Sequence, residues 1–349
     1  MDLLELGLAR TFEHARLRGH HGQSAYIGYL RRWPGATDGM EHVHASVVEP
    51  DGSVRFASYA LAVQGTLATP DESVAVQQTV THIRARIESG RRFRAAISRA
   101  SGSPLEADFV AGHGQDLVSH ALFWMLSAED NLLTLANAFS TGDLYAHGPY
   151  SLLRGAAEPL ARLTWLFDDK VATSNRYQRL LSERRENQEE FGKLKAFAPF
   201  AATRIQHIDK LATSAGFKAN SRADATSLFR RVLKEMGADP ARDPLGEVLY
   251  RVLSGQIHSL MWALMGQADV VSAQQVGRVR LAKIELDLYL FLKLIDPVYR
   301  MHDVAHEHWC RMHGTNQGAW RSLAAQLPAR GQLGIEYRRP GSLAEKLNL

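Results

Sequence analysis

The chain has 349 residues, of which 45% are hydrophobic and 22% charged, an ordinary composition for a globular protein. Its net charge of +4, from 41 basic and 37 acidic residues, permits contact with nucleic acid but does not require it. The single cysteine, Cys310, excludes an internal disulfide and any zinc site built on several cysteines.

The sequence carries no targeting or membrane-spanning signal. The N-terminus lacks a basic region followed by an apolar run, so no signal peptide is predicted. The longest apolar stretch, Leu286–Ile295, is interrupted by Asp287 and Lys293 and falls short of the ~20 residues that a membrane span needs. We therefore expect a cytoplasmic protein with no membrane partner.

Residues 1–113 have the pattern of a small α/β region. Asp2–Arg18 shows apolar residues at helical spacing, and Ser73–Glu88 predicts a second helix. Between them, Glu41–Val63 alternates apolar and polar residues on both sides of the turn Pro50-Asp51-Gly52, which predicts a β-hairpin.

Residues 114–314 predict a helical bundle, so the fold class is mainly α. The break Ala111-Gly112-His113-Gly114 marks the expected domain boundary, and residues 315–349 are expected to form a C-terminal tail. Pro159 is expected to kink or restart its helix. The segments with helical periodicity are Leu117–Phe139, Tyr150–Phe167, Asn175–Phe197, Ala223–Met236, Pro244–Gly266, Ala273–Leu294 and Pro297–His313.

One predicted helix carries a polar stripe made of Glu247, Arg251, Ser254 and His258. At 100° per residue, these four side chains fall within an arc of about 60°. A polar stripe often simply faces water. Here the same arc continues into the apolar residues of 261–265, which favours a cleft or a partner surface.

The residue types on this stripe fit metal-free RNA cleavage. His258 can exchange a proton near neutral pH, and Arg251 is a permanent cation whose forked donors suit phosphate. Such a pair can move a proton and stabilise the charge on phosphorus as it becomes five-coordinate. Glu247 could orient Arg251 through an i,i+4 pair, and Ser254 adds a hydroxyl between them.

The segment Arg251–His258 resembles the Arg–His motif of the HEPN superfamily, with six residues between the two. That resemblance implies a helical domain that dimerises and places two motifs across a shared cleft. It implies a metal-independent ribonuclease, as in prokaryotic toxins and defence effectors, with Arg251 and His258 as the catalytic pair, RNA as partner and no cofactor.

A second resemblance couples two segments of the chain. Residues 150–168 and 250–258 look like a group of uncharacterised helical proteins from actinobacteria, for which no activity is implied. Arg154 and Glu158 share one helical face, so either could lie opposite Arg251 and His258 as a further site residue. The other interpretation is a structural ion pair.

Two alternatives remain open from sequence. The first is a non-catalytic helical protein for interaction or regulation. The second is a metal-dependent helical enzyme that uses His302 and His306, because their i,i+4 spacing is typical of a metal-binding pair. The segment lacks the glutamate that a metalloprotease carries between its two histidines, and a packed or solvated histidine face is the main expectation.

Overall fold

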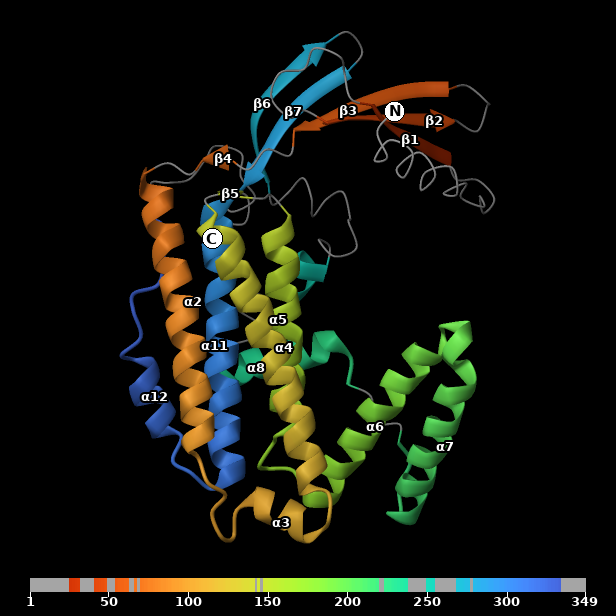
Figure 1. Cartoon of the computed structure of the whole chain (residues 1–349), viewed down its shortest axis with the longest axis vertical. Helices are drawn as coiled ribbons and strands as arrows, with labels where there is room; N and C mark the ends of the chain where they lie inside the picture. The colour runs from red at the N-terminus through yellow and green to blue at the C-terminus, as the bar shows by residue number, and fades with distance from the viewer. Residues whose placement is uncertain are drawn as a thin grey trace.

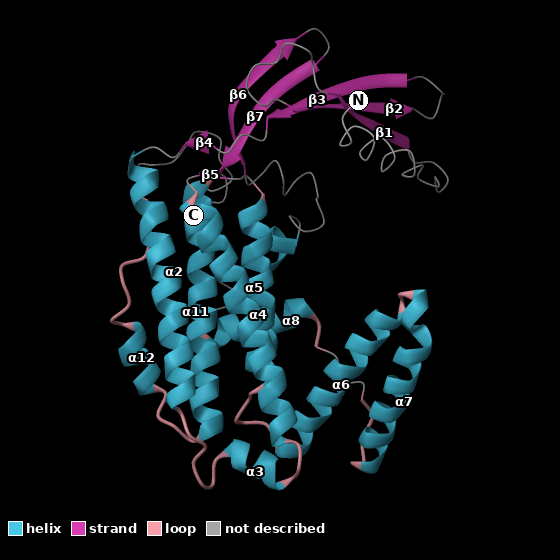
Figure 2. Cartoon of the chain, in the orientation of Figure 1, coloured by secondary structure: helices cyan, strands magenta, loops and turns pink. Residues whose placement is uncertain are grey.

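The computed structural model describes the backbone of residues 25–31, 41–48, 54–62, 66–67, 70–141, 143–144, 147–219, 223–237, 249–254, 268–276 and 279–333. Side chains are described for 70–141, 147–219, 223–237, 249–254 and 286–333. The protein is mainly helical, as predicted (Figure 2). None of the described helices combines the length and the apolar character that a bilayer span requires.

Four long helices build the bundle and run side by side in Figure 1: α2 (Pro70–Ala96), α4 (Gly114–Ser140), α5 (Gly148–Leu166) and α11 (Leu288–His313). Shorter helices surround them, namely α3 (Pro104–Val110), α8 (Ala225–Glu235) and α12 (Gly318–Ala324). A pair of helices, α6 (Thr173–Gly192) and α7 (Ala198–Ser214), projects from one side and is joined by the short 3-10 helix η1 (Lys195–Phe197).

The described strands lie beyond one end of the bundle (Figure 1). β1 (Ala25–Arg31), β2 (Glu41–Val48), β3 (Val54–Ala62), β6 (Ala268–Val276) and β7 (Val279–Leu286) form a sheet of order β1-β2-β3-β7-β6. β2 and β3 pair antiparallel, and the turn between them lies outside the described residues, as does the helix predicted over Asp2–Arg18. The short strands β4 (Thr66–Leu67) and β5 (Asp143–Leu144) pair separately.

The sequence predicts a helix over Ala273–Leu294, but within residues 268–294 the structure has strands first and a helix only at the end. The antiparallel pair β6–β7 occupies the first part of that range, and α11 begins at Leu288 and continues through Pro297 to His313. The segment is rich in valine, a β-branched residue that favours strands. The cap at the start of α11 is Asp287, whose carboxylate accepts the Leu290 N–H at 2.8 Å.

The domain boundary predicted at residues 113 and 114 differs from the described packing. Buried residues of α2, α4, α5 and α11 belong to a single hydrophobic core, so the bundle begins at Pro70 rather than at Gly114. The break at Gly112 is a tight turn with φ +86°, which reverses the chain between two helices of the same core.

The segment predicted as a tail, residues 315–349, packs against the bundle over its described part. Trp320 of α12 is completely buried, and its Nε1–H donates to the Asp303 carboxylate at 3.1 Å. Leu333 packs against the main core. Residues 334–349 lie outside the description.

The expected kink at Pro159 is replaced by a continuous α5. A proline cannot donate to the carbonyl four residues earlier, which here belongs to Gly155. The Asn131 side-chain amide of α4 donates to that carbonyl at 3.2 Å. A Cβ on Gly155 would lie 2.5 Å from the Asn131 Oδ1, so the glycine permits this close approach of α4 and α5.

Candidate functional site

A ladder of charged side chains runs along α5 on the face predicted for a site. Arg154 donates to Glu158 from Nε at 3.1 Å and from Nη2 at 2.8 Å. Arg162, one turn later, donates to the other oxygen of Glu158 at 3.1 and 3.3 Å. The spacing of four residues brings each pair together on one side of the helix. Glu158 is therefore held between two guanidinium groups.

The ladder continues onto α6 through Glu183. Arg162 Nη1 contacts both oxygens of Glu183 at 2.9 Å, and the Glu183 side chain is buried. Burial opposes ionisation of Glu158, but the hydrogen bond and charge of Arg154, together with Arg162, hold its pKa below the usual value. Burial raises the pKa of Glu183, which Arg162 offsets only in part. Of the two carboxyl groups, Glu158 is therefore the one whose shifted pKa favours the ionised form.

The second half of the predicted site begins at Tyr250, within the helical residues 249–254. The Arg154 guanidinium lies over the Tyr250 ring, 4.7 Å from its centroid, in a cation–π contact. The same ring also meets Phe229 of α8, with the centroids 5.4 Å apart and the planes nearly edge-on. The two segments that the sequence suggested to be coupled, 150–168 and 250–258, therefore meet through Arg154 and Tyr250.

Residues 249–254 turn their apolar side chains into the core. Leu249, Val252 and Leu253 are buried in the core, whereas Arg251 is exposed and Ser254 is half-buried. The polar stripe thus faces away from the core at these two positions. Glu247 and His258 lie outside the described residues, so the geometry of the Arg251–His258 pair stays a prediction.

Arg154 has one feature that a structural ion pair alone does not explain. Its Nη1 is buried, yet it has no hydrogen-bond partner among the residues that the structure describes. A buried donor without a partner costs about 1–3 kcal/mol. For a phosphate oxygen to satisfy it, the side chains that enclose Nη1 must move aside, while Glu158 already holds the guanidinium in a fixed orientation.

The two histidines considered for a metal site, His302 and His306, are fully buried in α11. His306 Nδ1 donates to the His302 carbonyl at 2.9 Å, so its Nε2 accepts the N–H of Arg94 Nη1 at 2.8 Å. The ring also stacks on Trp320 at 3.9 Å. Both nitrogens of His306 are therefore occupied, and burial keeps its pKa well below the usual value.

His302 has no neighbour set that fits a metal ion. Its Nε2 lies 3.9 Å from Oε1 of Glu129, and that carboxylate is already bound by Arg91 at 2.9 Å and by Arg94 at 2.6 Å. Within the described side chains, no three His, Cys, Asp or Glu residues gather as metal ligands. The two histidines of the i,i+4 pair pack in the core beside cationic arginines, an arrangement that disfavours a bound cation.

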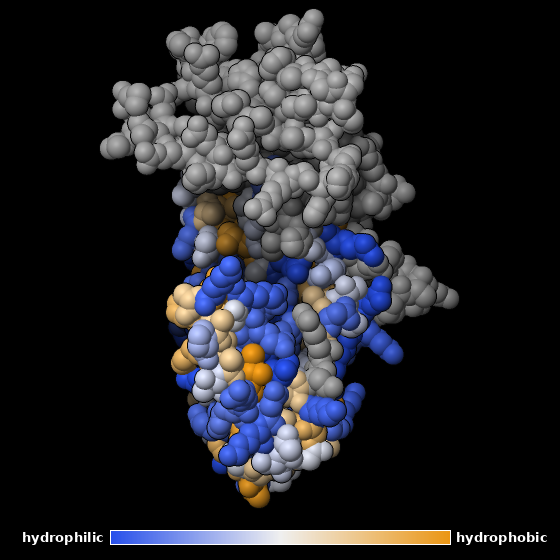
Figure 3. Space-filling view, turned by 90° about the vertical axis from the view of Figure 1, so that its right-hand side faces the viewer, coloured by the Kyte–Doolittle hydropathy of each residue, from blue (hydrophilic) through white to orange (hydrophobic). Residues whose placement is uncertain are grey.

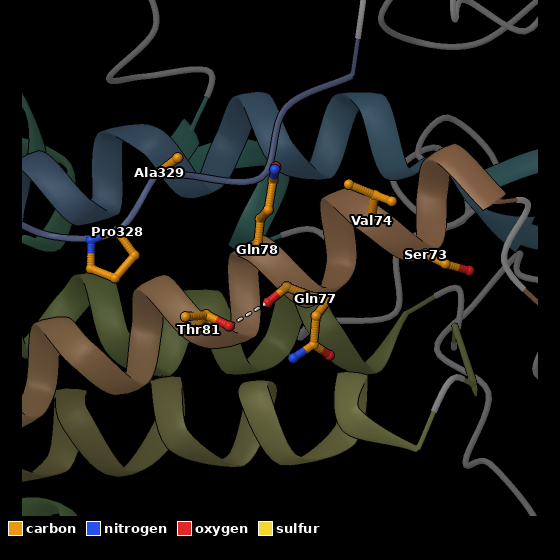
Figure 4. Close-up of a pocket in the computed structure, with 7 residues that line it drawn as sticks. All are labelled: Ser73, Val74, Gln77, Gln78, Thr81, Pro328 and Ala329. Carbon is orange, nitrogen blue, oxygen red and sulfur yellow. Dashed lines mark hydrogen bonds between the residues drawn. The ribbon is translucent and has the colours of Figure 1, made fainter.

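A shallow groove of about 410 Å³ lies elsewhere, between α2 and the chain that follows α12 (Figure 4). Val74, Gln77, Gln78 and Thr81 line one side of it, and Pro328 and Ala329 line the other. None of the lining residues can act as an acid or base near neutral pH. The groove therefore offers no catalytic group, and none of the predicted site residues line it.

Sequence reasoning missed three members of the site: Arg162, Glu183 and Tyr250. Arg162 follows Glu158 by four residues, a signal that was present in the sequence. Glu183 belongs to a different helix, and its pairing depends on how α6 packs. Tyr250 precedes Arg251 directly, and only the packing of its helix against α5 reveals its contact with Arg154.

Comparisons with known proteins do not identify the class to which this chain belongs. No family model matches the chain, and no curated protein or solved structure matches it significantly.

Proposed function

We propose that this chain is a metal-independent ribonuclease whose site lies where α5 meets the helix of residues 249–254. The observation that carries the proposal is the contact between Arg154 and Tyr250, because it brings a partly buried guanidinium, whose Nη1 has no hydrogen-bond partner among the described residues, next to the segment that contains Arg251. In the proposed site, the guanidinium groups of Arg154 and Arg251 both bind the phosphate backbone of RNA.

In the proposed reaction, the 2′-hydroxyl of a ribose attacks the adjacent phosphorus and loses its proton. The bond from phosphorus to the 5′-oxygen breaks, and that oxygen gains a proton, leaving a 2′,3′-cyclic phosphate and a 5′-hydroxyl. His258 serves as the group that takes or gives a proton. Arg251 and Arg154 stabilise the negative charge of the five-coordinate phosphorus.

Two residues support these groups in the proposed site. Glu158 orients Arg154 through its two hydrogen bonds, and its lowered pKa keeps it a carboxylate that can do so. Ser254 supplies a hydroxyl for the ribose or phosphate. The remaining part of the proposal is a cytoplasmic homodimer acting as a toxin or defence effector, with two such sites facing a common cleft.

The test measures cleavage of a mixed-sequence RNA by the purified protein in excess EDTA. His258→Ala and Arg251→Ala are each expected to slow cleavage about 100-fold or more. The matched controls are His207→Ala and Arg92→Ala, because both residues are exposed and lie on other helices, α7 and α2. Absence of cleavage by the parent protein, or equal cleavage by all five proteins, contradicts the ribonuclease.

A non-catalytic interaction protein is the second candidate, and one observation favours it. Glu158 and Glu183 are both engaged by arginines: Glu158 pairs with arginines of its own helix, and Glu183 joins α6 to α5 through Arg162. This candidate predicts RNA or protein binding that Arg154→Ala and Arg251→Ala weaken, without any cleavage. Fluorescence anisotropy of a labelled RNA, measured on the same preparations, distinguishes binding from catalysis.

A further inference from the structure

The turn between α6 and α7 carries large apolar side chains that the bundle does not cover. Leu194, Phe197 and Phe200 are 57%, 46% and 53% exposed. Phe191 stacks against Phe197 at 4.6 Å and meets Phe200 edge-on at 6.2 Å. We call Phe191, Leu194, Phe197 and Phe200 the apolar tip. Figure 3 looks onto this side of the molecule, where apolar atoms appear among hydrophilic ones.

The tip stands on a rigid support of its own. Leu181 of α6 packs with Ile208 and Ala212 of α7 in a small core separate from the main one. Arg185 of α6 also donates to Asp209 of α7 at 2.9 Å. The two helices therefore hold the tip away from the bundle, at the end of a projecting pair (Figure 1).

The charged residues of the turn itself are cations, and Glu189 and Glu190 directly precede it. Residues 191–204 contain Lys193, Lys195 and Arg204 and no acidic residue. The Arg204 guanidinium lies over the Phe200 ring at 5.0 Å, and Lys193 reaches back to Glu190 at 2.6 Å. Apolar side chains at a convex end, bordered by cations, have the composition of an interfacial lipid anchor.

We propose that the apolar tip docks onto an anionic lipid surface. Leu194, Phe197 and Phe200 enter the boundary between headgroups and acyl chains, while Lys195 and Arg204 face the negative headgroups and Lys193 stays paired with Glu190. This contact is independent of the proposed ribonuclease, and it needs no helix that crosses the bilayer. The sequence-based expectation of no membrane partner rested on spanning segments and did not address such a surface contact.

The form of the tip favours lipid over a single nucleic-acid strand. A strand is bound in a groove in which bases stack on open ring faces. Here the turn is convex, one face of Phe197 is already covered by Phe191, and the exposed aliphatic Leu194 offers nothing to a base. The same side chains match the depth and the polarity gradient of a membrane interface.

The experiment measures flotation of the full chain with two kinds of vesicle. One is made of phosphatidylcholine alone, and the other also contains roughly 30–40% phosphatidylglycerol, an anionic lipid content that gives a strong surface potential. The parent protein is expected to float with the anionic vesicles and to be released by salt. Phe197→Ser with Phe200→Ser is expected to lower partitioning at least 10-fold, and Lys195→Glu at least about five-fold.

Matched controls place the effect at the tip. Phe123→Ser removes a ring that is 66% exposed on α4, and Lys210→Glu reverses an exposed charge on α7; both should float like the parent. Circular dichroism melts check that each variant folds. The proposal is overturned if the parent ignores anionic vesicles, if the controls lose as much as the tip variants, or if the tip variants lose binding to an RNA oligonucleotide while keeping vesicle binding.

Discussion

The imidazole of His308 joins α11 to the end of α8 through Glu235. Its Nε2 lies 2.6 Å from Oε2 of Glu235, and its Nδ1 lies 2.9 Å from the carbonyl oxygen of Phe167. A carbonyl oxygen only accepts, so Nδ1 is a donor. Burial opposes ionisation of Glu235, but the His308 hydrogen bond and charge lower its pKa, so it accepts as a carboxylate. Both ring nitrogens of His308 therefore face an acceptor.

We expect His308→Ala to destabilise the protein by about 2 kcal/mol, because it leaves the Phe167 carbonyl and the Glu235 carboxylate without this donor. Glu235→Gln should cost less, since the amide oxygen still accepts from the ring. Chemical denaturation followed by circular dichroism gives both values, and His207→Ala on exposed α7 serves as the control. Equal losses for all three variants would contradict this role of His308.

Buried histidines should make stability fall in mild acid. Burial lowers the pKa of both His82 and His120 to about 4, and those of His302 and His306 lie well below the usual value. Between pH 6.5 and 4 the unfolded chain binds protons on these rings that the folded chain does not. Since the unfolded state then holds more protons, the free energy of unfolding decreases as pH falls through this range.

His82 allows this pH dependence to be assigned to one ring. Its Nδ1 donates to the Pro328 carbonyl at 2.7 Å, and its Nε2 accepts from Arg86 at 3.2 Å. Gln in place of His82 can make both bonds and does not titrate. His82→Gln should therefore reduce the stability lost between pH 7 and pH 4.5, by an amount on the order of 2 kcal/mol. An unchanged slope of unfolding free energy against pH would show that His82 does not contribute.

A double-mutant cycle can test the support that Asn131 gives to the proline in α5. Asn131→Ala removes the donor to the Gly155 carbonyl and should cost about 1–2 kcal/mol. In a Pro159→Ala background the new backbone N–H can donate to that carbonyl, so the same change should cost less. Thermal unfolding of the four proteins gives the coupling. If Asn131→Ala lowers the free energy of unfolding equally in both backgrounds, Asn131 does not compensate for the N–H that Pro159 lacks.

Trp320 should be essential to stability although it lies beyond the predicted bundle. Its ring is completely buried and stacks on His306, and its Nε1–H donates a hydrogen bond to Asp303. Trp320→Ala is expected to lose about 3–5 kcal/mol of unfolding free energy. Trp320→Phe keeps much of the packing but not the hydrogen bond, so its loss should be smaller. If Trp320→Ala unfolds at the denaturant concentration of the parent, α12 does not contribute to the fold.

The sequence predicted the features that depend on local spacing. The neighbourhood of Arg154 and Glu158 followed from a separation of four residues on one helical face. This relation needs only the geometry of one helix. For the same reason the helical character of most of residues 114–314 was predictable.

Features that join distant segments were not predictable. The pairing of Arg162 with Glu183, and the stacking of Arg154 on Tyr250, depend on how separate helices pack. The burial of Trp320 could not be inferred from the Gly-, Pro- and Arg-rich composition around it. The segment before α11 carries apolar residues that fit either helix or strand, and there the β-branched valines were the better guide.

The position of α11 has a consequence for how the protein is made. Its buried side chains pack with α2, α4, α5 and α8, yet it is synthesised after all of them. Until Leu288–His313 has left the ribosome, the earlier helices have no surface on which to bury the faces that α11 covers. Nascent chains that stop before Leu288 should therefore aggregate or require a chaperone, and the native core should form only after α11 has been synthesised.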